Sequence, residues 1–142
     1  MATVIAFDFG LKRTGVAVGN TLTGSASPEC TLLSQDQKPD WQGISRLFEI
    51  WKPEQLVVGM PTELDGSENP LKKRIERFCN QLNGRYSLPV DQENEQFTSI
   101  EAAGRLKQLR QSGRKKKVSK EEVDKIAASI ILENWMTRQG YR

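Results

Sequence analysis

Short apolar runs alternate along this chain with longer segments whose apolar residues recur at helical spacing, and this order restricts the fold more than any other feature. Val4–Phe7 and Gly15–Gly19 are two such runs, and the short turn "GLKRT" between them predicts a hairpin. A third, weaker strand is expected around Ser27–Leu33. Strands and helices then alternate, which predicts parallel pairing. We therefore expect an α/β fold with a mixed five-stranded sheet, antiparallel in its first three strands and then parallel, flanked by helices.

The later part of the chain carries signals for helix and strand ends. Asp40 is a suitable N-cap for a helix in "PDWQGISRLFEIWKP", and Pro53 marks its end. The segment "SKEE" that starts at Ser119 resembles a capping box and opens a last helix, expected to run to about Trp135. The other expected elements are a strand in "EQLVVGMP" ending at Gly59, a helix from Leu71 to Leu82 closed by Asn83-Gly84, a strand from Leu88 to Asp91, and a helix starting at Thr98 or Ser99.

Size and composition predict one domain in a reducing compartment. The 142 residues suit a single domain over 1–142, with residues from about 137 as a short tail. No apolar run approaches the roughly 20 residues of a membrane span, and no signal-peptide pattern opens the chain. Cys30 and Cys79 lack metal-binding spacing and are interpreted as reduced thiols. A cytoplasmic protein without a membrane partner is expected.

The chain contains no histidine, which excludes several kinds of catalysis. Ser-His-Asp and Cys-His mechanisms, histidine general bases and histidine-ligated zinc all require that side chain. Acid–base or metal chemistry must therefore use Asp and Glu, with Lys or Arg in support.

Three acidic residues are placed where they could form a metal site. Asp8 ends the first buried run, Glu95 follows the Leu88–Asp91 strand, and Asp124 lies in the first turns of the last helix. Functional groups of open α/β sheets gather beyond the C-terminal ends of the strands. Three carboxylates suit hard divalent cations such as Mg²⁺ or Mn²⁺. Two such ions roughly 4 Å apart activate water and stabilise the leaving oxygen in phosphodiester cleavage.

Each of these carboxylates also has an ordinary structural interpretation. Asp8 would serve as a turn residue, and Asp124 as a partner of the helix dipole. Glu95 lies in the acidic run "DQENE", where solvation alone would account for it. Spacing along the chain does not show that the three meet in space, so the residue pattern leaves both interpretations open.

A basic segment near the last helix predicts nucleic-acid binding. No acidic residue occurs between Ala102 and Lys120. Clustered basic side chains bind phosphates without sequence preference, although a solvated helix face followed by a loop would look the same. "GRKKKVSK" has no aromatic residue, so phosphate contact is expected rather than base stacking. The candidate phosphate-binding residues are Lys12 and Arg13 in the first turn, with Arg105, Arg110, Arg114, Lys115, Lys116 and Lys117.

Four segments together resemble a known family. "IAFDFGLKRTGVAVGN", "VVGMPTELDGSE", "NEQFTSIEA" and "VDKIAASIILENW" occur in the order and at the distances of the YqgF/RuvX family. Members of that family are described as pre-16S rRNA nucleases and as Holliday junction resolvases, and they are RNase H-like proteins similar to RuvC. The resemblance extends from about Thr3 to Trp135. It implies that Asp8, Glu95 and Asp124 are the catalytic, metal-binding carboxylates.

The resemblance also implies an activity. It favours a Mg²⁺- or Mn²⁺-dependent nuclease that matures the 5′ end of 16S rRNA precursor, with RNA favoured over structured DNA as partner. Association with ribosome precursors and a monomer or weak homodimer are expected. One alternative is a Holliday junction resolvase, which would usually require a dimer. Another is a non-catalytic RNA- or transcription-associated binding factor. An actin-like ATPase is disfavoured, because that fold needs two domains.

The chain departs from the family pattern around the expected glutamate. Asn94-Glu95-Gln96 stands where the family often has Asp-Glu-Arg. Gln96 therefore lacks the permanent charge and bidentate donor of an arginine. Lys12 and Arg13 are the residues expected to supply that charge.

Overall fold

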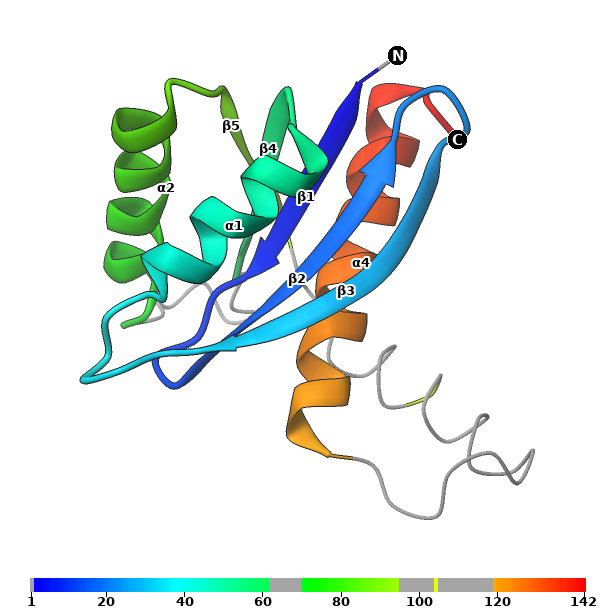
Figure 1. The fold of residues 1–142 in the computed structure, drawn as a ribbon. Coiled ribbons are helices and arrows are strands. Elements are labelled where there is room, and N and C mark those ends of the chain that lie inside the picture. The colour runs from blue at the N-terminus through cyan, green and yellow to red at the C-terminus, as the bar shows by residue number, and fades with distance from the viewer. Residues whose placement is uncertain (1, 62–69, 95–103, 105–118) are drawn as a thin grey trace.

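The computed structural model describes residues 2–61, 70–94, 104 and 119–142 (Figure 1). Within these residues, five strands form one sheet in the order β3-β2-β1-β4-β5. β1, β2 and β3 pair antiparallel, whereas β4 is parallel to β1 and β5 is parallel to β4. The predicted mixed sheet is therefore confirmed. The strands are β1 (Thr3–Asp8), β2 (Arg13–Asn20), β3 (Ser25–Leu33), β4 (Gln55–Met60) and β5 (Val90–Asn94).

Helices cover both faces of the sheet (Figure 1). α1 (Trp41–Trp51) and α2 (Lys72–Tyr86) pack on one face, and α4 (Lys120–Gln139) packs on the other. No helix in the described ranges is long and apolar enough to cross a membrane.

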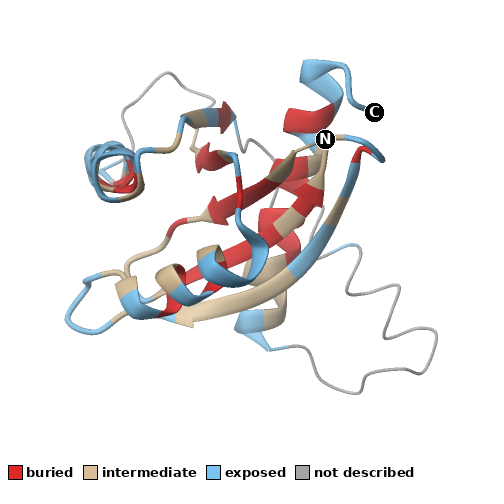
Figure 2. Cartoon of the chain, turned by 45° about the horizontal axis from the view of Figure 1, so that its top comes forward, coloured by how far each residue is buried: buried red, intermediate tan, exposed pale blue. Residues whose placement is uncertain are grey.

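Side chains of β1 point alternately to the two faces of the sheet, and both faces are covered by helices, so the apolar run of this strand is unbroken. Ile5 and Phe7 point toward α1 and α2, while Val4 and Ala6 point toward α4. All four are fully buried, as expected for a central strand covered on both faces. Figure 2 shows this burial in the middle of the sheet, whereas the edge strand β3 has no fully buried residue.

Both predicted N-caps are confirmed. Asp40 Oδ1 accepts a hydrogen bond of 3.0 Å from the backbone N–H of Gly43. Ser119 Oγ accepts one of 3.2 Å from the backbone N–H of Glu122. Gly104 is helical, and the rest of the helix expected from Thr98 or Ser99 lies outside the described residues.

The C-terminal ends of two helices were predicted too early. α2 continues through Asn83-Gly84 to Tyr86 and ends at Ser87, which is left-handed. Tyr86 packs edge-on against Phe48, 4.6 Å between ring centroids, so tertiary contacts extend this helix. β5 consequently begins at Val90, two residues later than expected.

The last helix is likewise longer than predicted. α4 runs four residues past Trp135 to Gln139, and the left-handed Gly140 caps it. Arg138, in its last turn, pairs with the buried Glu93 of β5, which ties that turn to the sheet. The first half of the expected tail, residues 137–139, is therefore helix.

Candidate active site

Asp8 lies at the edge of the sheet where the three parallel strands end. β1, β4 and β5 run in the same direction, so their last residues, Asp8, Met60 and Asn94, share this edge. Asp8 follows Val4 and Ala6 in the alternation and so belongs to the face covered by α4. The strand register therefore directs this carboxylate toward the last helix.

Gly15 allows α4 to approach Asp8. Gly15 is the β2 partner of Asp8 in the strand register. A Cβ atom on Gly15 would collide with the backbone carbonyl of Asp124. The absence of a side chain at this position thus lets the first turns of α4 lie directly against the sheet. Asp8 and Asp124, which are 116 positions apart in the sequence, are brought together by this close approach.

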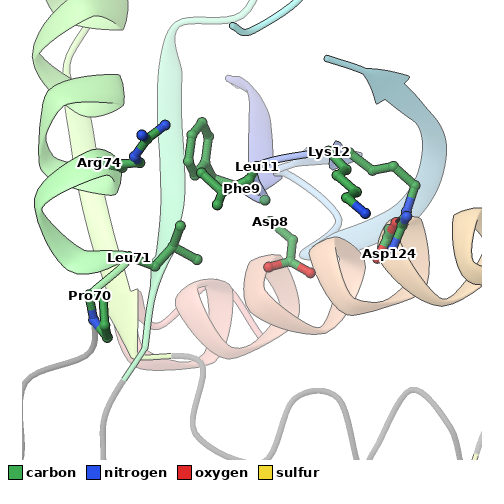
Figure 3. Close-up of a pocket in the computed structure, with 10 residues that line it drawn as sticks. Asp8, Phe9, Leu11, Lys12, Pro70, Leu71, Arg74 and Asp124 are labelled. Atoms are coloured by element: carbon green, nitrogen blue, oxygen red, sulfur yellow. Dashed lines mark hydrogen bonds and ion pairs between the residues drawn. The ribbon is translucent and has the colours of Figure 1, made fainter. Parts of the chain in front are cut away.

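The two carboxylates line one pocket of about 580 Å³ (Figure 3). Asp8, Lys12 and Asp124 lie on one side of it, and Leu71, the N-cap of α2, and Arg74 of α2 lie on the other. Its remaining walls are formed by Phe9, Gly10, Leu11, Arg13 and Pro70. The pocket therefore combines two acidic groups with three basic side chains.

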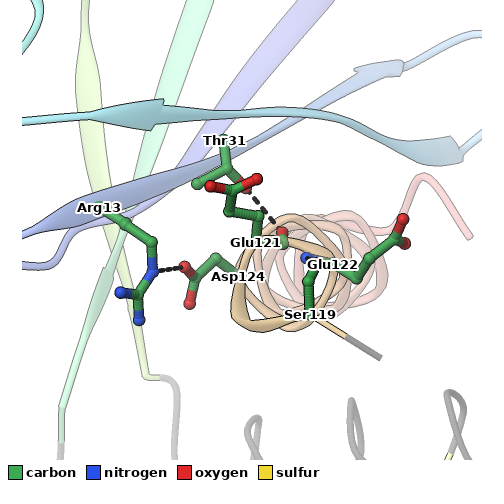
Figure 4. Close-up of polar contacts among 6 residues, drawn as sticks. All are labelled: Arg13, Thr31, Ser119, Glu121, Glu122 and Asp124. Carbon is green, nitrogen blue, oxygen red and sulfur yellow. Dashed lines mark hydrogen bonds and ion pairs between the residues drawn. The ribbon is translucent and has the colours of Figure 1, made fainter. Parts of the chain in front are cut away.

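An ion pair connects the start of β2 to α4. Arg13 Nε donates to Asp124 Oδ2 at 2.6 Å (Figure 4). Thr31 Oγ1 donates to the backbone carbonyl of Glu121 at 2.7 Å, and this bond attaches the same helical turn to β3. Both contacts keep the start of α4 in place beside the sheet.

Four of the predicted site residues are together in this pocket. They are Asp8, Lys12, Arg13 and Asp124. The described residues contain no group of three or more carboxylate or thiol side chains placed to hold a metal ion. Two carboxylates facing one pocket nevertheless match the oxygen ligands that divalent cations prefer. The remaining predictions, Glu95, Arg105, Arg110, Arg114, Lys115, Lys116 and Lys117, lie outside the described residues.

Sequence reasoning missed Arg74 as a site residue. Arg74 projects from α2 into the pocket opposite Asp124. The signal was present in "LKKRIER", which places three consecutive basic residues at the start of a helix. Such a run is normally a solvated helix face, and only the packing of α2 shows that one member reaches the site.

Two neighbouring acidic residues of β5 are structural. Asp91 Oδ2 accepts a hydrogen bond of 3.0 Å from Trp135 Nε1. Glu93 is buried and pairs with Arg138, whose Nε lies 2.6 Å from Glu93 Oε1. Both side chains therefore attach β5 to α4.

Comparison with known proteins places this arrangement in a family. The family model RuvX, described as Holliday junction resolvase, matches residues 2–138. The chain belongs to the RuvX family. A RuvX relative from Hydrogenovibrio crunogenus, named "Putative pre-16S rRNA nuclease", is 49% identical over 133 residues, covering 94% of this chain and 92% of the relative. One of the same name from Actinobacillus pleuropneumoniae serotype 5b is 42% identical over 137 residues, covering 96% and 98%.

Solved structures share the fold of this RuvX chain. Thermus thermophilus RuvC in complex with a Holliday junction substrate superposes with a TM-score of 0.55 at 16% identity, covering 99% of this chain and 97% of that one. The yeast mitochondrial Holliday junction resolvase Ydc2 gives 0.59 at 12% identity, covering 97% and 79%. The RuvC-like, RNase H-like fold implied by the sequence is confirmed.

Family membership also defines the class of reaction. The RuvX relatives and the family description both name nucleases. This RuvX chain is accordingly a hydrolase of phosphodiester bonds, and its substrate is nucleic acid.

Proposed function

We propose that this chain is a divalent-metal-dependent nuclease that cuts the precursor of 16S rRNA at its 5′ end, with Asp8, Glu95 and Asp124 as metal ligands. The observation that carries the proposal is the meeting of Asp8 and Asp124 in one pocket lined by Lys12, Arg13 and Arg74. Acidic groups would hold cations, and the basic groups around them would hold the phosphates of the substrate.

The alternation of side chains along β5 supports Glu95 as the third ligand. Asp91 and Glu93 contact α4 and therefore lie on the face of the sheet to which Asp8 also belongs. Side chains alternate along a strand, and Glu95 follows these residues with the same odd parity in the sequence. Asn94, directly before it, ends β5 at the edge where Asp8 ends β1.

Resolvases and nucleases with this fold generally use divalent metal ions, and Mg²⁺ or Mn²⁺ is proposed for this chain. When bound, such an ion supplies an activated water and neutralises charge on the phosphate. The choice rests on the donor set, because carboxylate oxygens are the preferred ligands of both cations.

The residues of the pocket would position the substrate. Asp8 is held by the strand register, and the first turn of α4, which carries Asp124, is attached to β3 through Thr31. The backbone at both carboxylates could therefore stay in place while a metal ion takes over from Arg13 as the partner of Asp124. Lys12 and Arg13 on one side and Arg74 on the other could contact phosphates flanking the bond to be cut. These cations would compensate for Gln96, which stands where the family often has an arginine.

The choice of RNA follows the names of the relatives, which refer to pre-16S rRNA. Association with ribosome precursors in the cytoplasm, as a monomer or weak homodimer, belongs to this proposal. A Holliday junction resolvase is the second candidate, because the family description and the RuvC complex refer to that substrate. That activity needs two sites, and a dimer would supply them.

Cleavage of end-labelled precursor RNA tests the proposal. The RNA and a four-way DNA junction are incubated with Mg²⁺, Mn²⁺ or EDTA and the wild-type chain, Asp8→Asn, Glu95→Gln or Asp124→Asn. Metal-dependent cutting of the RNA that is lost in all three variants is expected. Asp91→Asn is the matched control, because Asp91 bonds Trp135 and should remain dispensable for cleavage.

Other results would point elsewhere. Symmetric cutting of the junction by a dimer would favour the resolvase. Salt-sensitive RNA binding without cleavage in any metal would contradict the nuclease proposal and favour a binding factor. Activity retained in Glu95→Gln alone would remove Glu95 from the ligand set and leave Asp8 and Asp124.

A further inference from the structure

A second pocket, of about 490 Å³, adjoins the candidate active site. Phe9 and Arg74 line both pockets, so the two hollows meet at these side chains. Figure 3 shows both residues on the side of the first pocket that faces away from Asp124. A strand of nucleic acid that left the active site past Phe9 would enter this second pocket.

The wall that α2 contributes to the second pocket is basic. Arg74, Arg77 and Arg85 line it, and all three are exposed. Gln81 lies between them, and steps of three or four residues keep all of these side chains on one face of the helix. From Arg74 to Arg85 this face extends about 16 Å along the helix axis. Such a row of guanidinium groups suits successive phosphates rather than a single anion.

An aromatic platform lies within the same pocket. The guanidinium carbon of Arg85 lies 4.1 Å from the centroid of the Trp41 ring. Trp41 is half-buried and packs on Phe78, with 5.7 Å between the ring centroids, so its ring is held in place. An arginine over an indole is an arrangement that also accepts a nucleobase by stacking.

A tight turn completes the pocket opposite α2. Gln35 and Lys38 exchange backbone hydrogen bonds of 3.2 and 2.8 Å around Asp36 and Gln37. Asp36 and Gln37 have φ angles of 51° and 62°, a conformation that is unfavourable for residues other than glycine. The turn places Lys38 in the pocket lining as a fourth cation beside the three arginines, together with the carboxylate of Asp36, so the lining stays net positive.

We propose that this second pocket binds a nucleotide of the single-stranded RNA that flanks the bond to be cut. Arg77 and Arg85 contact its phosphates, and the face of Trp41 from which Arg85 turns away supports its base. The volume is in the range of pockets that hold small ligands, and a nucleotide provides both the charge and the flat ring that the lining matches. The inference depends on the proposed function for the identity of the substrate.

Binding measured without cleavage tests this site. The complete chain is titrated into fluorescein-labelled single-stranded RNA of about 12 nucleotides in EDTA, and anisotropy gives Kd at several salt concentrations. The double variant Arg77→Gln/Arg85→Gln is expected to raise Kd about five- to twentyfold. It should also reduce the slope of log Kd against log salt by about 1.4, because two phosphate contacts are lost.

A matched control comes from the same helix. Lys72→Gln/Lys73→Gln removes the same charge from exposed positions of α2 that line neither pocket. Its Kd should stay within about twofold of the wild type. Equal losses of affinity in the two double variants would overturn the proposal, because the effect would then be one of net charge.

A second variant tests the aromatic platform. Trp41→Phe keeps an aromatic ring against Phe78 while it removes the indole beneath Arg85. We expect weaker binding of single-stranded RNA and little change for a blunt RNA duplex of the same length, whose bases are already stacked. An equal change for both RNAs, or none for either, would contradict a stacking role.

The cleavage assay separates this inference from the proposed function. If the wild type cuts no RNA but the Arg77/Arg85 double variant loses affinity selectively, the nuclease proposal fails and the second pocket stands as an RNA-binding site. If the wild type cuts RNA and the double variant binds and cuts it equally well, the second pocket has no role in substrate binding.

Discussion

Arg13 Nε lies 2.6 Å from Asp124 Oδ2, so the first residue of β2 neutralises a carboxylate 111 positions later in the chain. The two side chains are 29% and 21% exposed. Water screens an ion pair with this exposure, and its contribution to stability is about 1 kcal/mol or less. In the proposed function its larger consequence would lie in the site, because the guanidinium occupies the position of the positive charge that a metal ion would bring to Asp124.

Removing this guanidinium should strengthen metal binding. In Arg13→Gln, the cation that competes for Asp124 is absent, so Mn²⁺ affinity measured by titration calorimetry is expected to rise by about three- to tenfold. Lys12→Gln is the control, since Lys12 lines the same pocket and loses the same charge. An unchanged or weaker Mn²⁺ affinity in Arg13→Gln, relative to Lys12→Gln, would show that the ion pair does not compete with metal.

A methyl group at Gly15 should disturb both the fold and the site. The new Cβ would meet the backbone carbonyl of Asp124, which cannot move aside alone, so α4 must shift from the sheet. Gly15→Ala is expected to lower the free energy of unfolding by about 2 kcal/mol or more and to reduce RNA cleavage. Urea denaturation and the cleavage assay measure the two effects.

Gly84 provides the matching control for that substitution. A Cβ there would meet no atom within 4 Å, and Gly84 lies inside α2. Gly84→Ala should therefore raise the stability by about 0.5 to 1 kcal/mol, since alanine is the better helix former. Destabilisation of the two variants by equal amounts would argue against the close approach of α4 at Gly15.

Removing Arg138 alone should destabilise the fold more than removing Glu93 and Arg138 together. The Glu93 side chain is only 9% exposed, and its Oε1 lies 2.6 Å from Arg138 Nε. Arg138→Leu leaves a buried carboxylate unpaired and should cost about 2 to 3 kcal/mol. Glu93→Leu/Arg138→Leu should recover at least half of that cost. Additive losses in a double-mutant cycle, measured by urea denaturation, would contradict direct coupling.

Burial should make the Cys79 thiol unreactive. It should also make the free energy of unfolding depend on pH through the titration of this thiol. Burial raises the pKa of Cys79 from its ordinary 9.0 to about 11. The unfolded chain releases this proton near pH 9 and the folded chain near 11, so stability should fall as pH rises between these values. Thermal unfolding from pH 8.5 to 11 measures this fall, which should be smaller in Cys79→Ala. Identical dependence of thermal stability on pH in the wild type and in Cys79→Ala would contradict the raised pKa of Cys79.

Local patterns were sufficient for most of the fold. The alternation of apolar runs and helical segments predicted a mixed five-stranded sheet flanked by helices. The caps at Asp40 and Ser119 predicted where two of those helices begin. The errors lie at the ends of α2 and α4, where Tyr86 and Arg138 contact other elements. Local propensity cannot include these contacts, because they depend on residues distant in sequence.

The sequence by itself determined which chemistry is available: no histidine, an aspartate ending a buried strand, and motifs that identify the RuvX family. Only the tertiary structure decided which of those groups meet. Asp8 and Asp124 share a pocket because Gly15 lets α4 touch the sheet, and Arg74 joins them because α2 packs across β4 and β5. These contacts depend on close packing between elements that are distant in the sequence, and a local sequence pattern contains no information about how closely such elements pack.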